Sequence, residues 1–244
     1  MRITHRLFER HTPLFLGLIV VGFAIGGLVQ IVPLHTIATT IEPVEGVRPY
    51  SPLEQAGRDI YIREGCYVCH SQMIRPFREE VDRYGHYSLA AESVYDHPFQ
   101  WGSKRTGPDL ARVGGKYSNQ WHAAHLKDPQ SVIPTSIMPA YGFLADREID
   151  PESMAGHMRA LRVVGVPYTD EQIEAVVEHI ELQAGDPNVD GDIDTVREFY
   201  PKAAPGDFDG DPDRITEMDA LIAYLQMLGT LVDFAQYDPE RFKQ

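Results

Sequence analysis

The longest apolar stretch of the chain lies close to its start. It runs from Leu14 to Val32, a length of 19 residues, and Gln30 is its single polar member. As a helix this stretch would span about 28 Å, close to the roughly 30 Å thickness of the hydrocarbon core of a bilayer. The pattern therefore predicts one transmembrane helix.

Basic residues lie mainly on one side of this stretch. Arg2, Arg6 and Arg10 precede it, and Arg48 is the first arginine to follow it. The positive-inside rule then leaves the N-terminus in the cytoplasm and the chain after about residue 35 outside. A cleaved signal peptide is the alternative, because residues 36–38 form a passable small-x-small site, but its apolar region is usually about 7 to 15 residues long. The length favours a retained anchor.

The chain after the apolar stretch has no helical periodicity. Pro43, Gly46 and Pro49 recur in it, which is typical of an extended connection. The pattern predicts three parts: the cytoplasmic N-terminus with the anchor (1–38), a linker (39–50) and a larger domain outside the cytoplasm (51–244).

The larger domain is predicted to begin with a well-marked helix. Ser51 is an N-cap residue, Pro52 occupies the first helical position, and Glu54 completes a capping box three residues after the cap. Apolar residues recur at helical spacing as far as Glu64. We therefore expect a helix from Pro52 to Glu64.

A second helix is expected near the end of the chain. Apolar residues from Met218 to Leu228 follow helical spacing, and Gly229 stands at the predicted C-cap. Gly57, inside the first helix, would allow another helix to approach its backbone closely. The last helix is the obvious candidate for that contact.

The two cysteines of the chain lie between these helices. Cys66 and Cys69 are followed directly by His70, which is the spacing of c-type haem attachment. The thiols would form thioethers with the haem, and the imidazole would be the proximal iron ligand. A zinc site would need two more ligands near a second knuckle, and a thiol-disulfide site would follow a strand, which the pattern does not predict.

The composition narrows the class of protein. The 244 residues are 43% hydrophobic, which is enough for a folded core, and the net charge is -14. Residues 151–219 hold 17 acidic and five basic residues. An acidic surface excludes nucleic acid as an expected partner and suits either solubility or a basic protein partner.

The second axial ligand is predicted to be Met138. It lies in the segment from Ile133 to Tyr141, which is too rich in proline for a regular helix, so a loop would present its thioether. Met73 follows His70 too closely to reach the other haem face. Rival axial ligands are His86, His97, His122 and His125. Core positions are expected for Met154, Met158, Met218 and Met227, which have helical spacing.

The stretch from Thr106 to Leu110 resembles the threonine-glycine-proline-asparagine-leucine segment of class I cytochromes c. In that class the proline carbonyl accepts a hydrogen bond from the proximal histidine, so the resemblance implies that Pro108 orients His70. Asp109 replaces the usual asparagine. Three further residues offer donors to a haem propionate, although a structural role is as good an interpretation of each: Arg112, Tyr117 and Trp121.

Acidic segments occupy the chain before the last helix. A capping box at Thr169 and Gln172 predicts a helix with a buried stripe of Ile173, Val176, Val177 and Ile180. Its other face carries Glu171, Glu174, Glu178 and Glu181, which we expect to be solvated. Two further segments resemble calcium loops incompletely, and we expect both to be solvated: Asp186 to Arg197, and Asp207, Asp209, Asp211 and Asp213.

Four runs in the first 145 residues strongly resemble the monohaem subunit II of cbb(3)-type cytochrome c oxidases. These runs are 65–76, 92–98, 101–109 and 136–141. The resemblance implies a mainly α protein, with one N-terminal transmembrane helix and a class I cytochrome c domain that carries acidic insertions before its C-terminal helix.

The resemblance also implies a function in aerobic respiration at the bacterial inner membrane. One covalent haem c, with His70 and Met138 as axial ligands, would lie in the periplasm and relay electrons to the haem b and copper centres of catalytic subunit I. That subunit, not this chain, would reduce oxygen. A dihaem cytochrome c subunit is the implied neighbour and a soluble cytochrome c a possible donor. A free-standing anchored shuttle and a haem redox or gas sensor are the alternatives.

Overall fold

The computed structural model describes residues 5–36, 44–101, 104–185 and 193–235. The chain divides into two compact units, Met1–Glu42 and Pro43–Gln244.

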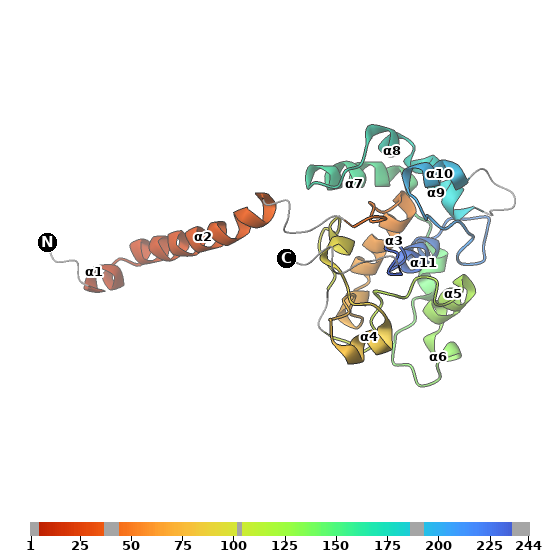
Figure 1. Ribbon diagram of the computed structural model, residues 1–244, viewed down its shortest axis with the longest axis horizontal. Coiled ribbons are helices and arrows are strands. Elements are labelled where there is room, and N and C mark those ends of the chain that lie inside the picture. Colours follow the sequence, from red (N-terminus) through yellow and green to blue (C-terminus); the bar gives the residue numbers. More distant parts are fainter. Residues whose placement is uncertain (1–4, 37–43, 102–103, 186–192, 236–244) are drawn as a thin grey trace. The chain divides into compact units, whose positions relative to one another are not determined.

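The described part of the first unit consists of two helices separated by His11. The short helix α1 (His5–Arg10) precedes α2 (Thr12–Thr36), as Figure 1 shows. The segment Thr12–Pro33 of α2 has 22 residues with a mean hydropathy of 2.4, and none of its most apolar window is buried. Among the described residues it is the one helix long and apolar enough to cross a membrane, where the sequence predicted such a helix. The helix continues three residues past Pro33, farther than the pattern indicated.

The described part of the second unit is built from helices and loops (Figure 1), with one isolated antiparallel bridge between Glu148 and Thr216. The α-helices are α3 (Pro52–Arg63), α4 (Arg78–Tyr84), α5 (Asn119–Lys127), α6 (Pro129–Val132), α7 (Pro151–Val163), α8 (Asp170–Glu174), α9 (Val176–Ala184), α10 (Ile193–Phe199) and α11 (Glu217–Met227). Three 3-10 turns complete it: η2 (Cys66–Val68), η3 (Ala90–Ser93) and η4 (Gly142–Asp146).

The predicted capping box starts α3. The backbone N–H of Glu54 donates to Ser51 Oγ at 3.3 Å, and the Ser51 N–H donates to Glu54 Oε2 at 2.9 Å. Pro52 occupies the first turn, where a missing N–H costs nothing. The helix ends one residue before the predicted end, and Gly65 follows in the left-handed region at φ 74°. Local sequence signals therefore determine where the segment carrying the cysteines begins.

Helices α3 and α11 pack against each other at the centre of the unit (Figure 1). An ideal Cβ on Gly57 would lie 1.8 Å from the carbonyl oxygen of Ala220 and 2.8 Å from Cβ of Tyr224. Only glycine permits this approach. The expected contact between the first and last helices of the domain is confirmed. Gly229, just past α11, adopts φ 75°, as expected for a C-cap glycine.

The last part of the predicted linker packs into the second unit. Arg48 is 8% exposed and makes two hydrogen bonds to the Glu54 carboxylate, at 2.7 and 2.9 Å. Its Nε donates to the carbonyl of Pro201 at 2.6 Å. Tyr50 is also buried, and its carbonyl accepts a hydrogen bond from the Tyr168 hydroxyl. These contacts make residues 48–50 part of the globular core.

The predicted helix after Thr169 is two helices, because the chain turns at Ala175 between α8 and α9. Ile173, Val176 and Ile180 are buried as expected, whereas Val177 is 38% exposed, so its predicted place in the buried stripe is wrong. Because the helix is interrupted at Ala175, the periodicity of a single continuous helix does not apply to the residues after the break. The acidic face is exposed as predicted, at Glu171, Glu174, Glu178 and Glu181.

The second acidic segment is not simply solvated, contrary to expectation. Asp209 is only 8% exposed, and its carboxylate accepts a hydrogen bond from the Thr216 hydroxyl at 2.8 Å. Asp219 accepts from the same hydroxyl and from the backbone N–H groups of Phe208 and Asp209. The cluster caps the start of α11. The first calcium-like segment lies mostly outside the described residues.

Candidate functional site

The cysteine pair lies on a tight turn directly after α3. The turn η2 begins at Cys66, and the backbone N–H groups of Cys69 and His70 both donate to the Cys66 carbonyl, at 3.2 and 3.0 Å. Gly65 allows the chain to leave α3 with a positive φ. Cys66 is half-buried, Cys69 is exposed, and both are free thiols. Both sulfurs and the imidazole are thus held on one short segment.

The surroundings disfavour the two alternative chemistries of a Cys-x-x-Cys motif. Burial raises the pKa of the Cys66 thiol to about 12, whereas a thiol-disulfide site depends on a lowered thiol pKa. Among the described residues the one group of three side chains arranged to hold a metal ion is Asp207, Asp209 and Asp219, which contains no cysteine. Within the described part of the chain, no such group includes the cysteines, so a tetrahedral zinc site there has no support.

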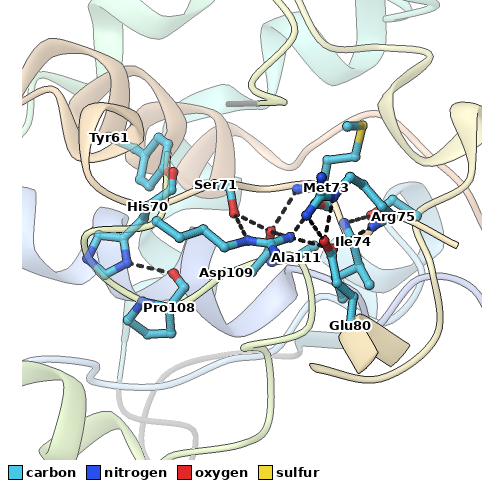
Figure 2. Close-up of polar contacts among 12 residues, drawn as sticks. Tyr61, His70, Ser71, Met73, Ile74, Arg75, Glu80, Pro108, Asp109 and Ala111 are labelled. Carbon is cyan, nitrogen blue, oxygen red and sulfur yellow. Dashed lines mark hydrogen bonds and ion pairs between the residues drawn. The ribbon is translucent and has the colours of Figure 1, made fainter. Parts of the chain in front are cut away.

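The His70 ring is oriented by a backbone carbonyl. Its Nδ1 lies 2.8 Å from the carbonyl oxygen of Pro108, as Figure 2 shows. The carbonyl only accepts, so the hydrogen belongs to Nδ1, and the lone pair of Nε2 is left for a metal. This is the contact implied by the resemblance to class I cytochromes c.

Gly107 lies against the face of this ring. An ideal Cβ on Gly107 would be 2.2 Å from Cε1 of His70 and 2.7 Å from both ring nitrogens. The Gly107 N–H donates to the Cys69 carbonyl at 2.9 Å, which holds the two backbones together. A side chain at this position must displace the imidazole.

We expect Gly107→Ala to lower the haem content of the purified protein several-fold, because the methyl group would push the His70 ring away from Pro108. A pyridine haemochrome assay against protein concentration measures the haem per chain. Gly142→Ala is the matched control, because its Cβ would lie 3.5 Å from the Lys127 carbonyl, an ordinary contact. Equal haem content in the two variants would contradict the assigned role of Gly107.

A row of stacked rings extends along α5. Tyr117 and Trp121 stack with centroids 3.9 Å apart, and Trp121 stacks on His125 at 4.7 Å. Burial lowers the pKa of His125, with a smaller electrostatic contribution from His70, so this end of the row lies near the proximal ligand. His122 is buried on another face, and burial lowers its pKa to about 4. The proposed propionate donors Tyr117 and Trp121 therefore share a surface that leads to the site.

The loop carrying Met138 is fixed at both ends. The Met138 N–H donates to Ser136 Oγ at 3.2 Å, and the Tyr141 N–H donates to the Leu126 carbonyl at 2.7 Å. Met138 is half-buried against the core. Burial raises the pKa of Tyr141, with a smaller contribution from the thiols of Cys66 and Cys69, so the end of this loop lies near the cysteine turn. Met138 stays the predicted second axial ligand.

Four methionines were expected in the core because of their helical spacing, and all four are confirmed as core residues. Each is at most 7% exposed: Met154, Met158, Met218 and Met227. Of the rival histidines, His86 stacks on Phe234, and its Nδ1 lies 2.8 Å from the Tyr87 carbonyl.

Arg112 already has a carboxylate partner in the chain. Its two terminal nitrogens donate to the two carboxylate oxygens of Glu92, at 2.7 and 2.8 Å, and to the carbonyls of Ala111 and Tyr87. A propionate would have to compete with this bidentate pair. The structure therefore gives Arg112 less support than Tyr117 or Trp121 as a propionate donor.

The residues present fit a covalently attached haem. Two free thiols and an imidazole with an available Nε2 lie on one turn, and the methionine loop ends near the same turn. Apolar side chains are exposed around it, including Val68 at 55% and Ile137 at 81%. Exposed side chains of this kind are suited to cover the apolar faces of a porphyrin.

This architecture and site define a class I cytochrome c domain in a mainly helical chain that also carries one N-terminal helix suited to a membrane anchor. Residues 5–232 match the family described as "Cytochrome C oxidase, mono-heme subunit/FixO", and the chain belongs to that family. A search of the curated proteins gave no match. The family match extends through the acidic segments, whereas the resemblance seen in the sequence stopped near residue 145.

Several contacts of the site were not predicted from the sequence. The contact of Gly107 with the ring, the electrostatic influence of His70 on His125, and the ion pair of Arg105 with buried Asp109 all required the structure. The threonine-glycine-proline segment was the one available signal for Gly107, since a glycine before that proline is part of the motif.

Proposed function

We propose that this chain relays electrons through one covalent haem c to the catalytic subunit of a cbb(3)-type haem-copper oxidase. The family membership supports the place in an oxidase complex. The observation that carries the proposal is the His70–Pro108 contact on the turn that holds both free thiols, because it leaves Nε2 available to iron. When bound, the haem supplies a one-electron iron couple.

In this proposal each site residue has a separate role. The thiols of Cys66 and Cys69 bind the porphyrin covalently, and His70 and Met138 are the axial ligands. Pro108 holds the proximal imidazole in orientation. Donors to the propionates are Tyr117 and Trp121, and also Arg112 if a propionate competes successfully with Glu92.

No acid, base or nucleophile is needed for electron transfer, so oxygen reduction belongs to the catalytic subunit. The role of this chain is to hold the haem at a fixed place and to shield it from water. The haem would be attached covalently, held by two fixed ligands and surrounded by packed side chains. Each of these features lowers the reorganisation energy when the iron changes its oxidation state.

The proposed placement follows from the charges around the apolar helix. Residues 1–38 would contain the cytoplasmic N-terminus and the anchor in the bacterial inner membrane, 39–50 the linker and 51–244 the periplasmic haem domain. Partners would be the haem b and copper subunit, a dihaem cytochrome c subunit and, as a further donor, a soluble cytochrome c.

Rapid mixing of the anaerobic, oxidised complex with a reduced cytochrome c tests the relay. We expect the haem c of this chain to be reduced before haem b, and haem b to be reduced more slowly when this chain carries Met138→His. Haem b reduction at the wild-type rate in that variant would contradict the relay. Recovery of the chain without a haem b subunit after mild solubilisation would indicate a free-standing shuttle.

A further inference from the structure

The segment that carries Pro108 runs beside the segment that carries His70. The backbone N–H groups of Gly107 and Leu110 donate to the carbonyls of Cys69 and Ser71, both at 2.9 Å. The contact between the ring and the proline carbonyl lies between these two hydrogen bonds. The distance from the Pro108 carbonyl to the His70 ring therefore depends on how firmly the residues next to Pro108 and His70 are held.

Asp109 is the side chain that ties these segments together (Figure 2). Its side chain is 0% exposed. One carboxylate oxygen accepts from the Ser71 hydroxyl at 2.5 Å and from the Met73 N–H at 3.1 Å, and the other accepts from the Ala111 N–H at 2.9 Å. A single buried carboxylate thus bonds Ser71 and Met73, one and three residues after the histidine, and also Ala111 on its own segment.

Arg105 balances the buried charge. Its Nη2 lies 3.3 Å from Asp109 and 2.7 Å from Glu80, and its Nε donates to Ser71 Oγ at 2.7 Å. Glu80 is itself 4% exposed and also pairs with Arg75. The two guanidinium groups hold the pKa of Glu80 at about 2. A buried carboxylate without such partners would be strongly destabilising.

We infer that Asp109, paired in charge with Arg105, is a positioning residue for His70. It fixes the Pro108 carbonyl against the Nδ1–H group of the ring, and so sets the orientation and the electron-donating strength of the proximal ligand. This inference rests on the proposed function, because it concerns the ligand of the haem.

The contacts explain why a carboxylate occupies a position where class I cytochromes c usually have asparagine. Backbone N–H groups, a guanidinium and a hydroxyl surround the two oxygens of Asp109, and a carboxylate offers acceptors only. An asparagine has one acceptor oxygen. Its amide would turn an N–H group toward another donor or leave a buried donor unpaired.

Asp109→Asn in the haem-loaded chain tests the inference. We expect the His70 ring N–H to exchange with solvent about tenfold faster, the ratio that corresponds to a typical loss of one hydrogen bond. Proton NMR measures this exchange. We also expect a higher reduction potential, because a lost negative charge and a weaker bond to Pro108 both favour the reduced iron. Ser71→Ala should shift both readouts in the same direction by a smaller amount.

Asp96→Asn is the matched control. Asp96 is also a buried aspartate paired with an arginine, but its partners are Arg58 and the Tyr50 hydroxyl. We expect this variant to keep the wild-type exchange rate and potential. Equal shifts in Asp96→Asn and Asp109→Asn, or wild-type values in Asp109→Asn, would overturn the inference.

If Asp109→Asn does not fold, wild-type values in Ser71→Ala would overturn the inference instead. Electron delivery by the wild-type complex tests the proposed function separately, since the positioning role depends only on differences between variants of the haem-loaded chain.

Discussion

Gly57→Ala is expected to lower the free energy of unfolding by about 3 kcal/mol, the upper end of the usual cost of overpacking. The added methyl group would lie 1.8 Å from the Ala220 carbonyl oxygen and 2.5 Å from its carbon. Both atoms belong to the backbone of α11, so no side-chain rotation relieves the clash. The two helices must separate, and with them the buried Tyr224 between them. A loss of this size is a large part of the roughly 5 to 15 kcal/mol that stabilises a typical domain.

Urea unfolding of the full chain in detergent measures this effect, followed by circular dichroism. Gly156→Ala is the control, because Gly156 lies in α7 with nothing within 4 Å of an added Cβ. That variant should be stabilised by up to about 1 kcal/mol, since alanine is the better helix former. If the two variants unfold at the same urea concentration, the close helix contact is not what the structure indicates.

Met138→His is expected to abolish the far-red absorption band that reports a sulfur-to-iron bond. It should also lower the reduction potential by on the order of 0.1 V, a part of the roughly 0.8 V range that axial ligands control. Methionine is a weaker donor than imidazole and favours the reduced iron. Absorption spectroscopy and a redox titration of the purified protein measure the two effects.

The control for this variant is Met158→Leu. Met158 is 0% exposed in the core, and leucine has a similar volume, so the band and the potential should not change. A band that survives Met138→His would remove Met138 from the ligand role. A retained methionine leaves no open position on the iron. Ready binding of carbon monoxide by the reduced wild-type protein would therefore also contradict the ligand role of Met138, and it would support a sensor.

The helices were predictable where their signals are local. Ser51 and Glu54 are three residues apart, and their capping box formed as expected. Gly57 and Gly229 were also correctly interpreted, Gly57 as the place where another helix approaches closely and Gly229 as a C-cap glycine with a positive φ.

Contacts between distant residues explain most of what the sequence did not show. Arg48 and Pro201 are 153 residues apart, and their hydrogen bond draws part of the predicted linker into the core. Asp209 is buried, and its carboxylate accepts a hydrogen bond from the hydroxyl of Thr216, the N-cap residue of α11. Neither Pro201 nor Thr216 is marked as a partner by spacing or periodicity. The sequence therefore predicted only that the linker and the acidic segment are exposed.

The site was predictable in its chemistry and less so in its geometry. The spacing of the two cysteines and His70 indicated the cofactor, and the threonine-glycine-proline segment indicated the carbonyl that orients the ring. The charge balance around Asp109 depends on Arg105, four residues before it, and on Glu80, which lies on a separate segment in α4. The exchange of asparagine for aspartate was visible in the sequence, but its counter-charge was not.

Acid-acetone extraction of the purified chain tests the central claim most directly, because this treatment removes haem that is held by coordination alone. We predict that one haem per polypeptide stays bound through Cys66 and Cys69, as measured by the pyridine haemochrome spectrum of the extracted protein. Transfer of all the colour to the solvent would contradict the account.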